Sequence, residues 1–202
     1  MTSSATETSA YLAPQFLLSA YWQGIFPMAD DDGTIYWYDP DPRAVLPLES
    51  FHVSRSLQRV LSRREFEIKF DTSFEEVIRA CAAPAVGREE TWISSEIIEA
   101  YVRLHKLGFA HSVEAWRNGR LAGGLYGVAL NGLFAGESMF SRESNASKVA
   151  LAALVEHLCC RNFLLLDIQF LTEHLAQFGA IEISRRAYQQ KLAAALSQPA
   201  GF

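Results

Sequence analysis

Two periodicities of apolar and polar residues divide this chain into predicted helices and strands. Apolar residues at helical spacing, read together with capping residues, Pro and Gly, predict helices over 14–23, 54–64, 73–82, 95–107, 146–160, 171–178 and 185–196. Alternating or continuously apolar runs predict strands over 66–71, 111–117, 120–130, 132–140, 163–169 and 180–184. The pattern is typical of an α+β protein.

Short polar signals mark the turns and helix starts between these elements. Asn118-Gly119 and Asn131-Gly132 predict tight hairpins, which would join three consecutive antiparallel strands. The predicted helix starts share a polar residue that can cap free backbone N–H groups: Ser54, Asn145, and Ser73 together with Glu76 as a capping box.

Residues 39–43 interrupt the pattern, because Asp39-Pro40-Asp41-Pro42-Arg43 contains two prolines. Each proline biases the residue before it toward extended geometry, so no helix continues through this stretch. We expect a domain boundary here, with a small N-terminal domain over 1–43 and a larger domain over 44–202.

Composition and charge narrow the class of protein. Half of the 202 residues are hydrophobic and 20% are charged, which is ordinary globular composition and excludes a mainly disordered chain. The net charge of −5 argues against a nucleic-acid footprint over the whole surface but permits a local basic patch. Three cysteines without CxxC spacing suggest neither a disulfide framework nor a zinc site. No window reaches membrane-spanning length and the N-terminus resembles no secretory signal, so the default location is the cytoplasm.

Two predicted strands carry polar residues that burial alone would not favour. Glu137 is the one acid in the middle of the apolar run 132–140, and a buried carboxylate is costly unless it is used or paired. Asp167 and Gln169 are two residues apart, which places them on one face of a regular strand. The structural alternatives are an ion pair of Glu137 with Arg142 or Lys148, and an N-cap or strand-end role for Asp167 and Gln169.

The element order from residue 66 is β-α-α-β-β-β-α-β-α-β, in which a helix crosses from strand 132–140 to a parallel neighbour at 163–169. This order resembles the GNAT superfamily of N-acetyltransferases. The resemblance implies that the two parallel strands splay apart and hold an acyl group between them. Glu137 would then lie on one wall of the wedge, with Asp167 and Gln169 on the other. The pyrophosphate-binding loop of those enzymes is rich in glycine, whereas residues 142–147 contain none, which argues against acetyl-CoA.

The chain also resembles one family closely, the bacterial leucyl/phenylalanyl-tRNA–protein transferases, over about residues 17–195. The most specific string is Gly-Glu-Ser-Met-Phe-Ser-Arg at 136–142, followed by Asn-Ala-Ser-Lys at 145–148. Further matching stretches are Gly-Ile-Phe-Pro at 24–27, the Asp-Pro-Asp-Pro-Arg stretch at 39–43, Thr-Trp-Ile at 91–93 and Asp-Ile-Gln at 167–169.

The resemblance implies a reaction and its participants. Leu or Phe, with Met as a third candidate donor, would move from aminoacyl-tRNA to the α-amine of proteins that begin with Arg or Lys. The product would be marked for degradation by the N-end rule, with no metal or small cofactor. Because the donor is an ester, the enzyme mainly positions two groups and manages one proton.

The resemblance also implies roles for individual residues. Asp167 is expected to orient the Gln169 amide, which contacts the attacking amine, with Ile168 facing away from the site. Glu137 is expected to select the acceptor's N-terminal cation. Whether Gln169 relays a proton or only positions the amine stays open, because a neutral amide is a poor base.

The expected substrate-binding surfaces are an apolar pocket and a basic helix face. The pocket for the Leu or Phe side chain would be lined by Trp92, Leu125, Phe134, Met139 and Met28, where Met28 replaces the family's adenosine-stacking aromatic; the alternative is a plain core role. The tRNA phosphates would contact four arginines: Arg55, Arg59, Arg63 and Arg64. The alternative for these is a solvated charged face.

Two other functions are weighed against this one. The first is an acyl-CoA-dependent N-acyltransferase, which would require coenzyme A and survive ribonuclease. The second is a tRNA- or degron-binding module without catalysis, which would bind tRNA and form no labelled peptide.

Overall fold

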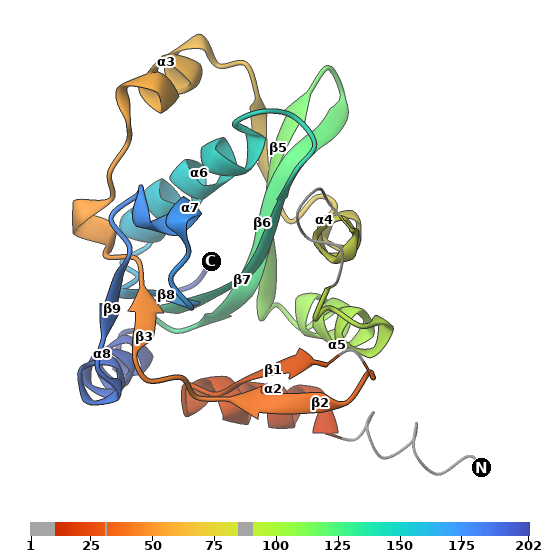
Figure 1. Ribbon diagram of the computed structural model, residues 1–202, viewed down its shortest axis with the longest axis vertical. Helices are drawn as coiled ribbons and strands as arrows, with labels where there is room; N and C mark the ends of the chain where they lie inside the picture. The colour runs from red at the N-terminus through yellow and green to blue at the C-terminus, as the bar shows by residue number, and fades with distance from the viewer. Residues whose placement is uncertain (1–10, 31, 85–90) are drawn as a thin grey trace.

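A mixed sheet of seven strands organises the computed structural model, which describes residues 11–30, 32–84 and 91–202 (Figure 1). In spatial order the strands are β4 (Glu67–Phe70), β5 (Ala110–Arg117), β6 (Arg120–Leu130), β7 (Leu133–Ser141), β8 (Leu165–Gln169), β3 (Arg43–Val45) and β9 (Ile181–Ile183). The strands from β4 to β7 pair antiparallel, β7 and β8 pair parallel, and β3 is antiparallel to both its neighbours.

Helices cover both faces of this sheet, which makes the chain an α+β protein with a large, helix-flanked mixed sheet (Figure 1). On one face α6 (Ala146–Cys160) packs across β5, β6 and β7. On the other lie α4 (Phe74–Ala82) and α5 (Ser95–Lys106). The helices α3 (Arg55–Arg63), α7 (Glu173–Ala176) and α8 (Arg185–Ser197) complete this part of the molecule. No helix among the described residues is long and apolar enough to cross a membrane.

The N-terminal segment forms a separate small layer below the main sheet in Figure 1. It consists of α2 (Pro14–Trp22) and a two-stranded antiparallel sheet of β1 (Phe26–Ala29) and β2 (Ile35–Tyr38). The sequence pattern did not predict these strands. Each is only four residues long, and β2 exposes its consecutive aromatic side chains instead of alternating them between core and solvent.

The predicted helices and strands are all present to within a few residues, but two predicted helix caps are wrong. Ser54 caps α3 as expected, since its hydroxyl accepts the N–H of Leu57. The Ser73 side chain makes no capping bond, and its N–H donates to Glu114 at 2.7 Å instead of to Glu76. Asn145 precedes α6 in the left-handed region, at φ 70°, and its side chain caps nothing.

Strand β3 begins at Arg43, the residue where the sequence predicts a domain boundary. It pairs with β8 through Ala44 and Val45 and with β9 on its other side, so it lies inside the main sheet. Residues 39–42 before it form no helix, as the two prolines predict. The division into two domains stays a prediction.

Strands β7 and β8 separate in the middle of the sheet, as the predicted wedge requires. Their pairing ends at Ala135 and Asp167. Two residues beyond Ala135, Glu137 has no partner on β6 either, because Tyr126 pairs with Ser138 and Gly127 with Gly136. Glu137 is thus the extra residue of a β-bulge, which changes the direction of its side chain relative to a regular strand.

A second irregularity lies opposite, in β8. Ala44 pairs with Gln169 and Val45 with Asp167, so Ile168 is left over as a bulge. Gln169 adopts the left-handed region at φ 59°. For a residue other than glycine this conformation costs about 1–2 kcal/mol, which other contacts must offset.

Candidate active site

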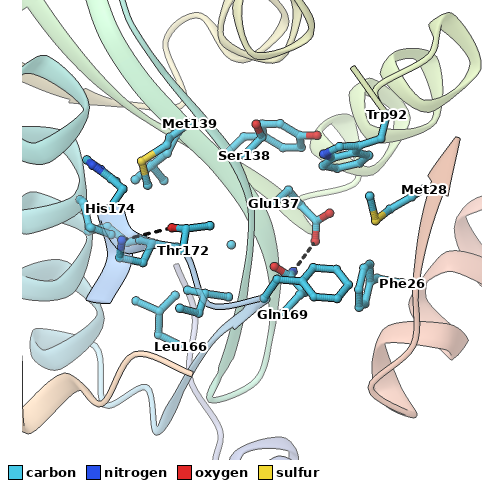
Figure 2. Close-up of a pocket in the computed structure, with 18 residues that line it drawn as sticks. Phe26, Met28, Trp92, Glu137, Ser138, Met139, Leu166, Gln169, Thr172 and His174 are labelled. Atoms are coloured by element: carbon cyan, nitrogen blue, oxygen red, sulfur yellow. Dashed lines mark hydrogen bonds between the residues drawn. The ribbon is translucent and has the colours of Figure 1, made fainter. Parts of the chain in front are cut away.

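A cavity of about 430 Å³ opens where β7 and β8 separate. Its walls come from β1, β6, β7, β8, α6 and the segment around α7, together with Trp92 (Figure 2). Most of the lining is apolar, and Glu137, Ser138, Gln169, Thr172 and His174 supply polar groups. In Figure 2 Met28 and Trp92 lie on one side of Glu137, while Met139 and His174 lie on the other.

The structure places most residues of the predicted apolar pocket on this cavity. Met28, Trp92, Leu125 and Met139 all line it. Phe134 does not: its ring is fully buried and stacks on Phe202 at a centroid distance of 5.4 Å. Phe134 therefore lies in the core and not on the cavity wall.

Ile168 also lies where the sequence does not predict it. A regular strand would turn Ile168 away from the site, but the residue lines the cavity beside Gln169. The reason is the bulge in β8, which breaks the regular alternation of side chains between Asp167 and Gln169.

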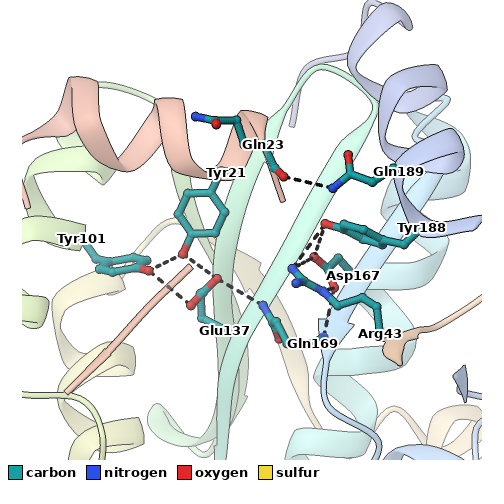
Figure 3. Close-up of polar contacts among 9 residues, drawn as sticks. All are labelled: Tyr21, Gln23, Arg43, Tyr101, Glu137, Asp167, Gln169, Tyr188 and Gln189. Carbon is teal, nitrogen blue, oxygen red and sulfur yellow. Dashed lines mark hydrogen bonds and ion pairs between the residues drawn. The ribbon is translucent and has the colours of Figure 1, made fainter. Parts of the chain in front are cut away.

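Glu137 sits at the centre of a hydrogen-bond network from four segments of the chain (Figure 3). The Tyr21 hydroxyl of α2 donates to its carboxylate at 2.8 Å and the Tyr101 hydroxyl of α5 at 3.3 Å. The Gln169 side-chain amide reaches it from β8 at 3.4 Å. The two tyrosine hydroxyls also contact each other, so all three contacts are hydrogen bonds at once only when Glu137 carries a proton.

The ion pairs considered for Glu137 are absent among the described residues. Arg142 instead pairs with Glu76 at 2.9 Å, and Lys148 donates to Gln177 at 3.2 Å. Burial raises the pKa of Glu137 to about 8, and the charge of Asp167 adds to this, while the tyrosine hydrogen bonds and Arg43 lower it. A carboxyl group with this pKa exchanges its proton near neutral pH.

The raised pKa predicts a pH-dependent effect of Glu137→Gln on stability. The folded protein keeps the Glu137 proton up to about pH 8, whereas an unfolded chain loses it near 4.5. Between these values the folded state binds more protons, so the free energy of unfolding falls as pH rises. Glu137→Gln removes this loss, and its stability relative to wild type should rise with pH, by at most about 1.4 kcal/mol per pH unit.

Urea unfolding of both proteins at several values from about pH 5.5 to 7.5 measures this difference. The matched control is Glu143→Gln, because Glu143 is an exposed carboxylate that pairs with Arg117 at 3.0 Å. A difference between Glu137→Gln and wild type that stays constant across this range would contradict the raised pKa.

Asp167 is buried behind the cavity, and its carboxylate is fully occupied. Arg43 donates from Nε to Oδ1 at 2.9 Å and from Nη2 to Oδ2 at 2.7 Å. The Tyr188 hydroxyl donates to Oδ2 at 2.8 Å, and the backbone N–H of Gln169 donates to Oδ1 at 3.0 Å. The family resemblance implies that Asp167 orients the side-chain amide of Gln169; the contact observed is with the backbone of that residue.

The four predicted tRNA-binding arginines lie away from this cavity. Arg55, Arg59, Arg63 and Arg64 are all exposed, on α3 and the residue that ends it. Leu57 anchors the opposite side of α3 in the core. Arg63 lies 3.6 Å from Glu65, an ion pair whose arginine side is 71% exposed. The face is open to solvent, and its role in binding RNA stays a prediction.

Four residues of the network were missed by sequence reasoning: Tyr21, Arg43, Tyr101 and Tyr188. Arg43 carried a usable signal. It begins the apolar run Arg43-Ala44-Val45-Leu46, and a charge that enters a buried strand needs a partner, the argument applied to Glu137. The tyrosines carried none, because buried tyrosines on helices are ordinary core residues. Among the described residues, no group of His, Cys, Asp or Glu side chains could hold a metal ion.

Comparison with known proteins assigns nearly the whole chain to one family. The sequence profile of the leucyl/phenylalanyl-tRNA protein transferases matches residues 45–193, and the profile of their N-terminal domain matches residues 11–41. The chain is 61% identical over 192 residues to a protein of Herpetosiphon aurantiacus named leucyl/phenylalanyl-tRNA–protein transferase, covering 95% of this chain and 98% of that one. A protein of Gloeobacter violaceus with the same name is 56% identical over 192 residues, covering 95% of this chain and 97% of that one.

Among solved structures, the structure of L-PGS from Bacillus licheniformis is similar to this chain with a TM-score of 0.45 and 16% identity. The similarity covers 80% of this chain and 61% of that one.

Proposed function

The chain belongs to the leucyl/phenylalanyl-tRNA–protein transferases, and from this premise we propose how its cavity carries out aminoacyl transfer and which substrates it takes. The enzyme is an aminoacyltransferase that moves an amino acid from tRNA to the N-terminus of a protein. We propose Leu or Phe as the donor residue, with Met as a third candidate, and Arg or Lys as the first residue of the acceptor. The product then enters N-end rule degradation in the cytoplasm.

The observation that carries the proposed site is the contact between Gln169 and Glu137. It bridges the separated strands β7 and β8 at 3.4 Å, beside an apolar cavity of about 430 Å³. The cavity offers apolar walls for a Leu, Phe or Met side chain, together with a small number of polar groups. A GNAT-like arrangement, in which an acyl group sits between two splayed parallel strands, is part of this proposal.

In the proposed reaction the α-amine of the acceptor attacks the ester carbonyl carbon of aminoacyl-tRNA. The new C–N bond forms, the C–O bond to the ribose breaks, and the ribose hydroxyl leaves with a proton. Because the Gln169 side-chain N–H donates to Glu137, its carbonyl oxygen is available to accept an N–H of the attacking amine. Gln169 thus holds the amine in line with the ester, and such positioning lowers the barrier.

Glu137 is proposed to bind the acceptor and to receive its proton. An N-terminal amine has a pKa of about 8, and burial raises the pKa of Glu137 to about 8 as well. The approaching ammonium favours the ionised form of Glu137, because an opposite charge stabilises a carboxylate. Proton transfer from the ammonium to that carboxylate is then nearly balanced in free energy, which suits a group that releases a neutral nucleophile.

A transfer assay tests the proposed function. Labelled Phe-tRNA is mixed with a peptide that begins with Arg and with a matched peptide that begins with Asp. The expected result is label on the Arg peptide alone, without coenzyme A, and no label when the tRNA is first digested with ribonuclease. Label that requires coenzyme A and survives ribonuclease would support an acyl-CoA-dependent N-acyltransferase. Bound tRNA without labelled peptide would support a non-catalytic binding module.

The arginines of α3 predict a salt-dependent effect on tRNA binding. Replacing Arg59 and Arg63 with Gln should lower the slope of log K against log salt by roughly one unit for each phosphate that is no longer neutralised. The measurement is a salt titration of tRNA binding. The control replaces Arg79 and Arg103, two exposed arginines on α4 and α5 that pair with Glu75 and Glu99, and should leave the slope unchanged. Equal slopes in wild type and both double variants would show that the α3 arginines contact solvent and not tRNA phosphates.

A further inference from the structure

A buried arginine lies behind the cavity and contacts neither substrate-facing group directly. Arg43 is 2% exposed, at the start of β3, and forms a two-point ion pair with Asp167, whose side chain is also 2% exposed. Its guanidinium carbon lies 4.8 Å from the centroid of the Phe26 ring and 4.5 Å from that of Tyr188. The two rings and the carboxylate fix the arginine in one orientation, because its planar fork matches a carboxylate at two points.

The Asp167 carboxylate links Arg43 to the backbone of Gln169. Its Oδ1 accepts from both Arg43 and the Gln169 N–H, and its Oδ2 accepts from both Arg43 and Tyr188. Four donors occupy the lone pairs of the two oxygens, and Asp167 does not line the cavity. Asp167 is thus in no position to exchange a proton with a bound substrate.

Gln169 needs this support, because its backbone is held in an uncommon conformation. The residue follows the Ile168 bulge and has φ 59°. The hydrogen bond from its N–H to Asp167 stabilises that conformation and directs the side chain across the gap toward Glu137 (Figure 3). A regular extended backbone at Gln169 would turn the amide away from Glu137.

We propose that Arg43 is a positioning residue for the transfer reaction, acting through Asp167 to hold Gln169 in its reactive orientation, with Tyr188 as a second support. This inference rests on the proposed role of Gln169. Arg43 on β3, Asp167 on β8 and Tyr188 on α8 together form one clamp behind the site.

Arg43→Lys is the first test, because it keeps the charge and loses the two-point geometry. The expected result is a fall in kcat of up to about 100-fold, as for a small misplacement of a reacting group, with an unchanged KM for Phe-tRNA. The matched control is Arg185→Lys. Arg185 pairs with Asp39 at 2.9 Å on neighbouring elements, is about half exposed, and should have no effect on kcat.

A double-mutant comparison separates positioning from general structural damage. In a Gln169→Ala background Arg43→Lys should cause little further loss of kcat, because the residue it positions is gone. The same fold loss in both backgrounds would overturn the proposal. If Arg43→Lys fails to fold, Tyr188→Phe replaces it in the same comparison with a smaller expected loss, and Tyr36→Phe on the exposed strand β2 is its control.

An exchange experiment without substrate tests this proposal separately from the proposed function on which it rests. Backbone amide exchange of Gln169, followed by NMR, should be faster in Arg43→Lys than in wild type, while Arg185→Lys stays at the wild-type rate. An unchanged exchange rate would overturn the clamp even if transfer activity falls. If wild type shows no transfer but Gln169 exchange is faster in Arg43→Lys than in wild type, the clamp is supported and only the proposed function is contradicted.

Discussion

Asp167→Asn is expected to lose both most of the transfer activity and a large part of the folding stability. Asparagine keeps the shape of the side chain but replaces one oxygen with an NH2 group. That donor would face two other donors, either Arg43 and Tyr188, or Arg43 and the Gln169 N–H. Either choice leaves the Arg43 charge buried without a carboxylate. Breaking a buried ion pair in this way costs about 3–5 kcal/mol.

Two measurements check this expectation. Urea unfolding gives the stability, and single-turnover transfer from Phe-tRNA gives the rate, which should fall by at least about 100-fold. Binding of tRNA should change little, because α3, whose arginines are proposed to contact it, lies apart from β8, the strand that carries Asp167 (Figure 1). The control is Glu75→Gln at the exposed pair with Arg79, where the cost should stay below about 1 kcal/mol. Unchanged turnover in Asp167→Asn would refute its role.

Glu137→Ala is expected to weaken the acceptor peptide far more than the tRNA. The carboxylate receives donors from Tyr21, Tyr101 and Gln169, and it is the acidic group on the cavity wall. A hydrogen bond to a charged group contributes about 1.5–3 kcal/mol, which corresponds to an increase of roughly 10- to 100-fold in the KM for an Arg-starting peptide.

The comparison that decides this second case uses both substrates. The KM for the peptide and the Kd for Phe-tRNA are measured in Glu137→Ala and in Glu143→Ala, which removes an exposed carboxylate paired with Arg117. Glu143→Ala should leave both constants as in wild type. Equal losses for peptide and tRNA in Glu137→Ala would indicate a structural role.

Local signals in the sequence predicted the frame of this site well. The Asn-Gly pairs at 118–119 and 131–132 produce the β5–β6 and β6–β7 turns, and α6 carries the chain to the parallel strand β8. These features depend on residues close together in the chain, where turn geometry and apolar periodicity act directly. They were enough to bring Glu137 and Gln169 to facing strands.

The finer geometry was not predictable, because it depends on bulges and distant partners. A regular strand would place Ile168 away from the site, and the bulge puts it on the cavity wall. Arg43 lies 124 residues from Asp167, and Tyr21 lies 116 residues from Glu137. Single-sequence patterns do not register such pairs, so they do not identify Arg43 as the partner of Asp167.

The measurement that tests the site most directly is a crystal structure with a non-hydrolysable amide analogue of phenylalanyl-adenosine and an Arg-starting peptide. The phenyl ring should lie among Trp92, Leu125 and Met139, with the peptide's α-amine in contact with Gln169 and Glu137 and roughly 3–3.5 Å from the analogue's carbonyl carbon. An analogue bound outside the gap between β7 and β8, or an α-amine held by other residues, would show that transfer does not take place between these two strands.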